Sequence, residues 1–307
     1  MRKNKLLLYI AGPTGIGKTD LSIDIALKFN TEIISCDSRQ FYKELKIGTS
    51  PPSNKQLSTV KHHFIHNMSI HDSYNAGIYE KEGVQVIDKL FKKFDILILT
   101  GGSGLYADAI LYGIDNFPSI ANDIRKKITE EYKLGGLEYL QERLKKLDKE
   151  YYEEVDINNS NRIIRALEVI ESTGEKFSKF RTNKKKIRNF ETHILKIYSD
   201  RELLYSRINR RVDKMVEMGL EEEVYKLKEY KNLSTLNTVG YKEFFNYFEG
   251  NLSYIETVNK IKQNTRNYAK RQITWLKKYK DVTNIVLGEE FESINNKIEG
   301  ILWKRQF

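Results

Sequence analysis

The feature that most narrows the possible folds of this chain is the octapeptide GPTGIGKT at residues 12–19. It fits the pattern G-x-x-x-x-G-K-[ST], whose glycines let backbone N–H groups curl around a phosphate. The apolar run Leu6–Ala11 precedes it and predicts a buried strand, while Leu21, Ile25 and Leu27 follow at helical spacing. Strand, glycine-rich turn and helix start together predict a site for a diphosphate or polyphosphate, with an ordinary glycine-rich turn as the alternative.

Each part of this turn has its own physical role. The following helix contributes partial positive charge at its N-terminus, Lys18 contributes a full charge, and the Thr19 hydroxyl can hold Mg²⁺. The predicted diphosphate- and nucleotide-binding residues are Gly12, Pro13, Thr14, Gly15, Ile16, Gly17, Lys18 and Thr19. The motif alone does not define which phosphate compound binds or which reaction follows.

Composition sets broad limits on the class of protein. The chain has 307 residues, of which 40% are hydrophobic, so we expect one large domain or a core with an insertion. It has no apolar run of membrane-spanning length, no signal-peptide pattern and a single cysteine, Cys36, which predicts a cytoplasmic protein without a membrane partner or a disulfide framework. A net charge of +10 favours a polyanionic partner, although a solvated lysine-rich surface would give the same excess.

Asp37 is the first candidate for chemistry. It follows residues 32–36, a predicted second strand, and the carboxyl ends of parallel strands face the ligand crevice of an open α/β sheet. A carboxylate there can hold Mg²⁺ or act as a general base, or it can simply cap a helix.

A third predicted strand, residues 94–100, ends without an acid. An ATPase with this kind of turn needs an acid there for Mg²⁺ and water, so its absence weighs against a plain ATPase. The small residues 101–104 suggest instead a close approach of the backbone to a ligand. Between these strands, residues 45–75 read as irregular, and their four histidines lack the cysteines and spacing of a metal site.

The predicted fold is therefore α/β: a P-loop NTPase-like parallel sheet flanked by helices, with a helical insertion domain. Residues 1–118 and 191–307 would form the core with its C-terminal helices, and residues 119–190 the insertion. Two glycines at 135 and 136 should break a helix of the insertion, and residues 161–170 form an amphipathic helix with a basic side that could face nucleic acid.

Two further basic groups lie after the insertion. Arg207, Arg210 and Arg211 recur on a predicted helix and could clamp a leaving diphosphate, with surface ion pairing as the alternative. Later, residues 262, 266 and 270 are basic and four apart, which predicts a one-sided stripe suited to a phosphate backbone.

These motifs, in this order, resemble those of the bacterial tRNA dimethylallyltransferases, also called tRNA isopentenyltransferases or the IPP transferase family. The similarity covers nearly the whole chain and includes residues 12–19, 37–42, 47–49, 62–63, 101–106, 161–169, 173–174, 219–224, 239–243 and 265–275. Some positions depart from the family pattern: Pro51 stands where lysine is usual, Ser103 replaces threonine, and His66 stands where aspartate is common.

The resemblance implies transfer of a dimethylallyl group from dimethylallyl diphosphate to N6 of the adenosine 3′ of the anticodon, in tRNAs that read codons starting with U. It implies catalytic roles for Asp37 as base and for Thr19 and Arg211 at the diphosphate, with Mg²⁺ as cofactor on Thr19. The implied partners are the tRNA anticodon stem-loop and dimethylallyl diphosphate, and we expect a monomer. The implied tRNA-binding residues are Asp37, Ser38, Arg39, Gln40, Ser103, Arg125, Asn161, Arg162, Ile163, Ile164 and Arg165.

Three other functions use the same phosphate-binding turn. An adenylate isopentenyltransferase would act on a free nucleotide and would not need the insertion or the basic stripe. A P-loop small-molecule kinase would need an acid near the third strand, and a non-catalytic RNA-binding GTPase-like module would lack a role for Asp37.

Overall fold

The computed structural model describes residues 5–182 and 184–304. Its contacts divide the chain into two compact units, the core (up to Leu111 and from Ile187 onward) and the insertion (Tyr112–Lys186). The sequence predicts the insertion at 119–190, and the structure corrects both boundaries. Phe117 stacks on Phe177 within the insertion, with ring centroids 4.9 Å apart, whereas Phe190 packs on Phe91 in the core.

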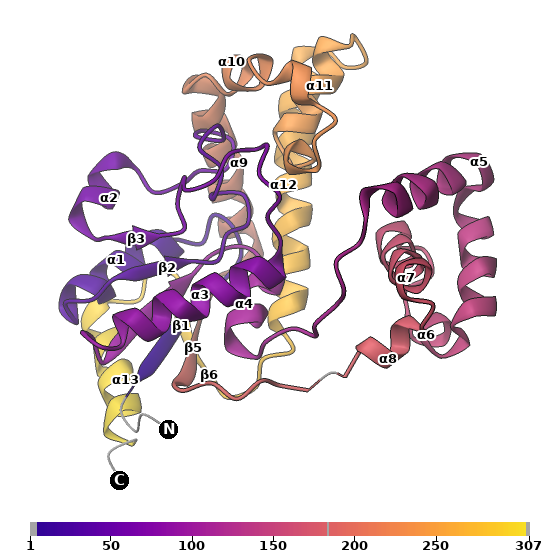
Figure 1. Ribbon diagram of the computed structural model, residues 1–307. Coiled ribbons are helices and arrows are strands. Elements are labelled where there is room, and N and C mark those ends of the chain that lie inside the picture. Colours follow the sequence, from indigo (N-terminus) through magenta and orange to yellow (C-terminus); the bar gives the residue numbers. More distant parts are fainter. Residues whose placement is uncertain (1–4, 183, 305–307) are drawn as a thin grey trace. The chain divides into compact units, whose positions relative to one another are not determined.

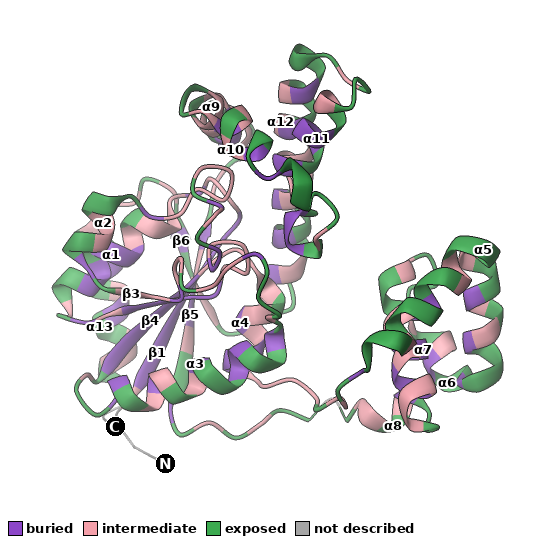
Figure 2. Cartoon of the chain, turned by 45° about the horizontal axis from the view of Figure 1, so that its top comes forward, coloured by how far each residue is buried: buried purple, intermediate pink, exposed green. Residues whose placement is uncertain are grey.

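The core is built on a six-stranded sheet in the order β3-β2-β4-β1-β5-β6, in which every neighbouring pair is parallel. The strands are β1 (Leu6–Ala11), β2 (Ile33–Ser35), β3 (His62–His63), β4 (Ile96–Thr100), β5 (Glu191–Tyr198) and β6 (Val282–Val286). Strands β1, β2 and β4 are buried along their whole length, as Figure 2 shows, because helices cover both faces of a parallel sheet. The predicted P-loop-like α/β fold is therefore confirmed.

Helices cover the sheet on two sides (Figure 1). On one side, α1 (Lys18–Lys28), α9 (Arg201–Glu217), α12 (Tyr254–Leu276) and α13 (Phe291–Trp303) share an apolar cluster with Leu6, Leu8 and Ile10 of β1. The other side carries α3 (Ala76–Leu90) and α4 (Gly104–Leu111), which pack against each other. The upper ends of α9 and α12 extend beyond the sheet and enclose a second apolar cluster with α10 (Leu220–Tyr225) and α11 (Tyr241–Phe248), beside the short turns η1 (Lys228–Tyr230) and η2 (Ser234–Leu236).

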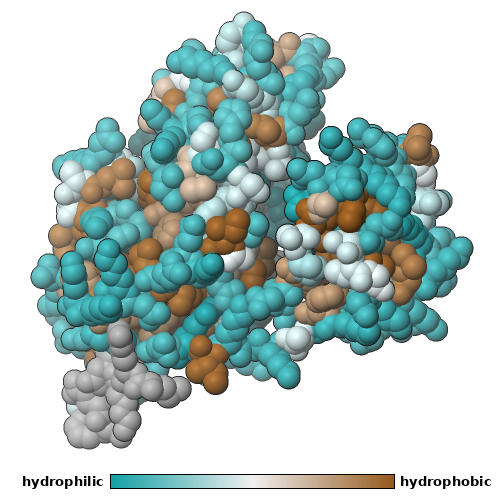
Figure 3. Space-filling model, viewed as in Figure 1, coloured by the Kyte–Doolittle hydropathy of each residue, from teal (hydrophilic) through white to brown (hydrophobic). Residues whose placement is uncertain are grey.

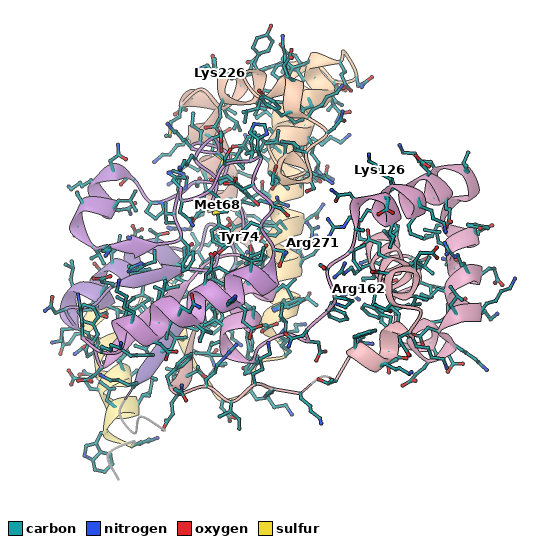
Figure 4. The ribbon with its side chains drawn as sticks, viewed as in Figure 1. Met68, Tyr74, Lys126, Arg162, Lys226 and Arg271 are labelled. Atoms are coloured by element: carbon teal, nitrogen blue, oxygen red, sulfur yellow. The ribbon has the colours of Figure 1, made fainter. Side chains whose placement is uncertain are left out.

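The segment between β2 and α3 is more ordered than its composition suggests. It contains α2 (Asn54–Thr59) and the short edge strand β3, where the sequence analysis predicts irregular structure. Ser53 and Gln56 form a capping box at the start of α2, a signal that is readable in the sequence as S-x-x-Q. The rest of the segment crosses the sheet as loops that carry Met68 and Tyr74 (Figure 4).

The insertion is helical and has its own core. It consists of α5 (Asn122–Leu147), α6 (Lys149–Glu154), α7 (Ser160–Thr173) and α8 (Phe177–Phe180). Gly136 has φ 70° and ψ −169° and bends α5 sharply, so the predicted break is confirmed. Buried Asp148 accepts hydrogen bonds from Tyr151 N at 3.2 Å and Ser178 N at 2.7 Å, which ties the ends of α5, α6 and α8 together.

The face shown in Figure 3 is largely hydrophilic, with groups of apolar side chains between the hydrophilic ones. Within the described residues, none of the helices combines the length and the hydrophobicity that a membrane span requires.

Candidate active site

A cavity of about 930 Å³ opens at the carboxyl ends of the strands. Its walls come from the turn after β1, the segments after β2 and β4, and the side chains of α9 and α12, and all of its lining residues belong to the core. The three residues assigned catalytic roles from the sequence, Thr19, Asp37 and Arg211, all line this cavity.

The glycine-rich turn has the backbone that its sequence predicts. Gly15 and Gly17 have φ angles of 81° and 101°, in the left-handed region that favours glycine, and α1 begins directly after Gly17. A Cβ on Gly15 would lie 3.1 Å from the side chain of Ile208, so this glycine also allows α9 to pack closely on the turn.

Lys18 lies inside the turn with its ammonium group turned back on the backbone. Its Nζ donates hydrogen bonds to the carbonyl oxygens of Gly12 and Pro13, each at 2.9 Å. Burial, and next the positive charge of Arg211, lower the pKa of Lys18 to about 8, while Asp37 partly opposes this. A bound diphosphate would favour the protonated amine of Lys18, because its negative charge would lie close to the ammonium group.

Asp37 is held by backbone donors on two sides. Its Oδ1 accepts from Arg39 N at 3.1 Å and its Oδ2 accepts from Gly102 N at 3.2 Å. A carboxylate has about four acceptor positions, so two N–H donors leave capacity for a proton from a substrate. The half-buried side chain lines the cavity, which places a fixed base beside the turn.

The small residues after β4 approach other parts of the protein. A Cβ on Gly102 would lie 2.8 Å from Asp37 Oδ2, and one on Gly104 would lie 2.4 Å from Trp275 Nε1. The sequence analysis predicts a close approach to a ligand here, but the structure accounts for both glycines by contacts within the chain. They allow Asp37 and α12 to reach the end of β4.

Ser38 and Ser103, both predicted to contact tRNA, meet at the cavity wall. Their hydroxyl oxygens are 2.8 Å apart, and Ser38 N donates to Ser103 Oγ at 2.9 Å. The other two predicted residues of this segment bond to backbone carbonyls: Arg39 Nη1 donates to Thr235 O at 2.9 Å, and Gln40 Nε2 donates to Ser50 O at 3.1 Å. The segment is therefore fixed by the core before any substrate binds.

The arginines of α9 reach the cavity from the side opposite Asp37's strand. Arg211 donates from Nε to Ser50 Oγ at 2.8 Å and from Nη2 to Ser50 O at 3.2 Å. Burial lowers the pKa of Arg211, an effect that the charge of Asp37 opposes. Arg207 donates to Gly15 O at 2.8 Å, so the predicted clamp touches the phosphate-binding turn itself.

Helix α12 contributes residues that the sequence analysis did not single out. Buried Gln272 accepts from Thr14 N at 2.8 Å and donates to Gly102 O at 2.7 Å, and thereby links the turn after β1 to the end of β4. Tyr268 donates to the same carbonyl at 2.9 Å, and burial followed by the charge of Asp37 raises its pKa. The signal available in the sequence was the family resemblance at residues 265–275, which by itself gives neither residue a role.

The predicted basic stripe on α12 is wrong in part. Lys262 pairs with Asp213 at 2.5 Å, and Arg266 Nη1 donates to Asn209 Oδ1 at 2.7 Å, so both side chains face α9. Lys270 is exposed. Arg271 lines the cavity and extends from the middle of α12 (Figure 4).

The remaining predicted tRNA-binding residues belong to the insertion. Arg125, Asn161 and Arg162 are exposed on α5 and α7, and Figure 4 labels Arg162. Arg165 is half-buried, with Nη1 at 3.3 Å from Glu168 Oε2 and its guanidinium over the Phe117 ring.

Two apolar residues of α7 stand in the same predicted set. Ile164 is half-buried. Ile163 has no exposed surface and packs in the insertion core, so its side chain cannot contact RNA.

Metal ligands within the described residues are few. That part of the chain contains no group of three or more His, Cys, Asp or Glu side chains that could hold a metal ion. The Thr19 hydroxyl and the Asp37 carboxylate line the cavity, and Mg²⁺ is usually held by one or two such oxygens together with phosphate oxygens and water. The donors present therefore fit a Mg²⁺ bound mainly through its phosphate ligand.

The parallel sheet, the glycine-rich turn between β1 and α1, and the arginines that line the cavity place this chain in the P-loop class of α/β proteins. The family model "IPP transferase" matches residues 40–279, and the chain belongs to this family. It is 48% identical over 278 residues to a tRNA dimethylallyltransferase from Flavobacterium psychrophilum, covering 89% of this chain and 91% of the relative.

Solved structures give the same assignment. The tRNA isopentenylpyrophosphate transferase of Bacillus halodurans is similar at 31% identity with a TM-score of 0.72, covering 99% of this chain and 98% of that one. A eukaryotic dimethylallyltransferase acting on tRNA is similar at 29% identity with a TM-score of 0.77, covering 92% of this chain and 74% of that one. The predicted resemblance is therefore confirmed.

Proposed function

We propose that this enzyme transfers a dimethylallyl group from dimethylallyl diphosphate to N6 of the adenosine 3′ of the anticodon, in tRNAs that read codons starting with U. The observation that carries the proposal is that a fixed carboxylate, Asp37, lines the same cavity as the phosphate-binding turn and Arg211. Names of the relatives support the same reaction on tRNA.

In the proposed reaction, a carbon–nitrogen bond forms as a carbon–oxygen bond breaks. The N6 nitrogen bonds to C1 of the dimethylallyl group, the C1–O bond breaks with its electron pair on oxygen, and N6 loses one proton. An exocyclic adenine amine is a poor nucleophile, so a base that accepts this proton lowers the barrier. Asp37 would be that base, because its carboxylate is held at the cavity with unused acceptor capacity.

The diphosphate leaves with additional negative charge. Lys18, the N–H groups at the start of α1 and the guanidinium of Arg211 would stabilise that charge, since they are fixed in place before reaction. Mg²⁺, when held by the Thr19 hydroxyl and the diphosphate oxygens, would neutralise part of the same charge. No acid is needed to activate water, which fits the absence of one at the end of β4.

The tRNA would contact both units. At the cavity, Ser38, Arg39, Gln40 and Ser103 would surround the adenine, which has to leave its stack to reach Asp37. On the insertion, Arg125, Asn161, Arg162 and Arg165 offer polar groups, and Ile164 offers a half-buried apolar one, for the anticodon stem-loop.

The test is a transfer assay with purified protein, Mg²⁺ and labelled dimethylallyl diphosphate. The acceptors are a tRNA that reads codons starting with U, the same tRNA with guanosine 3′ of the anticodon, and AMP. We expect label only in the unaltered tRNA. Label in AMP would indicate an adenylate isopentenyltransferase, and ATP hydrolysis without transfer would indicate a kinase-like activity.

A further inference from the structure

The 45–52 loop (residues 45–52) forms one wall of the cavity. Gly48, Thr49, Ser50, Pro51 and Pro52 all line it. Both Arg211 and Gln40 donate hydrogen bonds to this loop, and the carbonyl of Ser50 accepts from each of them. Ser50 has a φ angle of 44°, a left-handed conformation that is uncommon for a residue other than glycine, and such a conformation persists only where its surroundings hold it.

The first part of this loop is bound to one remote carboxylate. Glu223 of α10 accepts from three consecutive backbone amides: Oε2 from Lys46 N at 2.9 Å and Ile47 N at 2.8 Å, and Oε1 from Gly48 N at 3.0 Å. Hydrogen bonds to an ionised carboxylate are roughly twice as strong as neutral ones. A single side chain thus fixes the direction of three peptide units.

Tyr241 completes this arrangement from α11. Its hydroxyl donates to Glu223 Oε1 at 2.5 Å, and its ring lies against Gly48, where an added Cβ would be 2.5 Å from the ring. Burial and the charge of Glu223 raise the pKa of Tyr241, so its hydroxyl remains a donor. The tyrosine hydroxyl therefore occupies the remaining acceptor position of the Glu223 carboxylate, and the tyrosine ring packs against the loop at Gly48.

A short turn connects the part of the loop held by Glu223 to the part held by Arg211. Ser50 N donates to Ile47 O at 2.9 Å, which closes a tight turn between the residue held by Glu223 and the residue held by Arg211. The chain from Gly48 to Ser50 is too short to absorb a shift at its beginning. A displacement of the amides of Lys46 and Ile47 must therefore move Ser50 and, with it, the guanidinium of Arg211.

We propose that Glu223 is a positioning residue for the transfer reaction: it holds residues 46–48, and through Ser50 it sets the position of Arg211 at the diphosphate. This inference rests on the proposed function, because it assigns Arg211 to the leaving group. Glu223 touches no reacting atom in this scheme and acts only through the loop. Because Arg211 bonds to both the side chain and the backbone of Ser50, the effect of Glu223 should be larger on kcat/KM for the diphosphate substrate than on the KM for tRNA.

The apolar packing around Glu223 does not depend on its charge. Leu45, Leu220, Val224, Leu236 and Phe244 are buried in one cluster beside it. Glu223→Gln keeps the shape of the side chain but places an NH₂ group against backbone N–H donors, which removes an acceptor and adds repulsion. We expect the loop to shift while this cluster stays packed.

The test compares four proteins in the tRNA transfer assay: wild type, Glu223→Gln, Tyr241→Phe and the matched control Glu222→Gln, which changes an exposed glutamate of the same helix. For Glu223→Gln we expect kcat/KM for dimethylallyl diphosphate to fall ~10–100-fold, because small displacements of a positioned group have effects of this size. The KM for tRNA should change by less than about twofold, because the substitution removes no side chain that is proposed to bind tRNA. Tyr241→Phe should give a smaller loss of the same kind, and Glu222→Gln none.

Hydrogen exchange of the backbone amides of residues 46–48 provides a readout that does not require activity. These amides should exchange faster in Glu223→Gln, while those of β1 and β4 remain protected. Wild-type protein without tRNA transfer would overturn the proposed function, and the exchange data would still test the hold on the loop. Active wild type with normal kinetics in Glu223→Gln, or an equal loss for both substrates together with a lowered Tm, would overturn the positioning role.

Discussion

Two walls of the same cavity are held in place by different means. The turn at residues 12–19 takes its shape from its neighbours in the chain, since β1 precedes it, α1 follows it, and glycines with positive φ allow its curvature; Gln272 and Arg207 then bond to it from α12 and α9. The 45–52 loop is fixed by side chains far away in the sequence: Glu223 is 176 residues from Ile47, and Arg211 is 161 residues from Ser50. The turn at residues 12–19 thus depends mainly on local backbone geometry, whereas the 45–52 loop depends on the packing of the whole core.

This difference has a functional consequence. The locally built turn presents backbone N–H groups, which are invariant in chemistry and suit any diphosphate. The loop built by distant contacts decides where Arg211 lies, and so it can adjust the site to one particular transition state.

The largest effect on turnover is expected from Asp37→Asn, which alters neither the turn at residues 12–19 nor the 45–52 loop. The amide keeps the size of the side chain but cannot accept the proton from N6, so turnover should fall ~10²–10⁴-fold. Affinity for tRNA should remain close to that of wild type. Single-turnover rates and filter binding measure the two quantities, and Asp24→Asn, an exposed position on α1, is the control. Near-normal turnover would remove Asp37 as the base.

The pH dependence of kcat/KM for dimethylallyl diphosphate tests the turn at residues 12–19 separately from the 45–52 loop. The pKa of Lys18 is lowered to about 8, so the amine is protonated below this pH and neutral above it. Only the protonated form attracts the diphosphate, so kcat/KM for dimethylallyl diphosphate should be level below pH ~8 and fall about tenfold per pH unit above it. A profile for Lys18→Arg that stays level to higher pH would identify the group, because arginine keeps its charge there. An unchanged break point in that variant would assign the titration elsewhere.

Gly48→Ala tests the second wall through stability. The added methyl group would lie 2.5 Å from the buried ring of Tyr241, so it must displace the loop or the ring. We expect a loss of ~1–3 kcal/mol in the free energy of unfolding, as overpacking usually costs.

The matched control for this substitution is Gly300→Ala in α13, where no atom lies near the added methyl group. It should raise the free energy of unfolding by ~0.5–1 kcal/mol, because alanine is a better helix former than glycine. Chemical denaturation measures both, and equal behaviour of the two variants would contradict the tight contact at Gly48.

The same contrast explains what the sequence could and could not predict. The turn at 12–19, strand β1 and the break at Gly136 follow from local patterns, and the structure confirms them. The roles of Gln272 and Glu223 depend on elements that approach only in the folded core, so no local pattern reveals them.

The errors have the same origin. Lys262 and Arg266 resemble a free basic stripe until α9 supplies Asp213 and Asn209 as partners. The helical spacing of α7 likewise predicts an apolar face, but only the packed insertion shows that Ile163 is wholly inside its core. The parts of the proposed site that are built by consecutive residues, such as the turn at residues 12–19, were thus predictable. The contacts that support the site from distant elements were not.

The smallest effect is expected from Arg162→Ala on α7, which separates RNA binding from both walls. This exposed arginine can neutralise one phosphate, so its loss should weaken tRNA binding a few-fold and lower the slope of log K against log salt by about 1. Because both walls stay intact, the KM for dimethylallyl diphosphate should not change. Lys149→Ala, an exposed position whose lysine lies 3.7 Å from Glu153, is the matched control. If Arg162→Ala altered the diphosphate KM and left tRNA binding unchanged, the insertion would serve the cavity walls instead of the RNA.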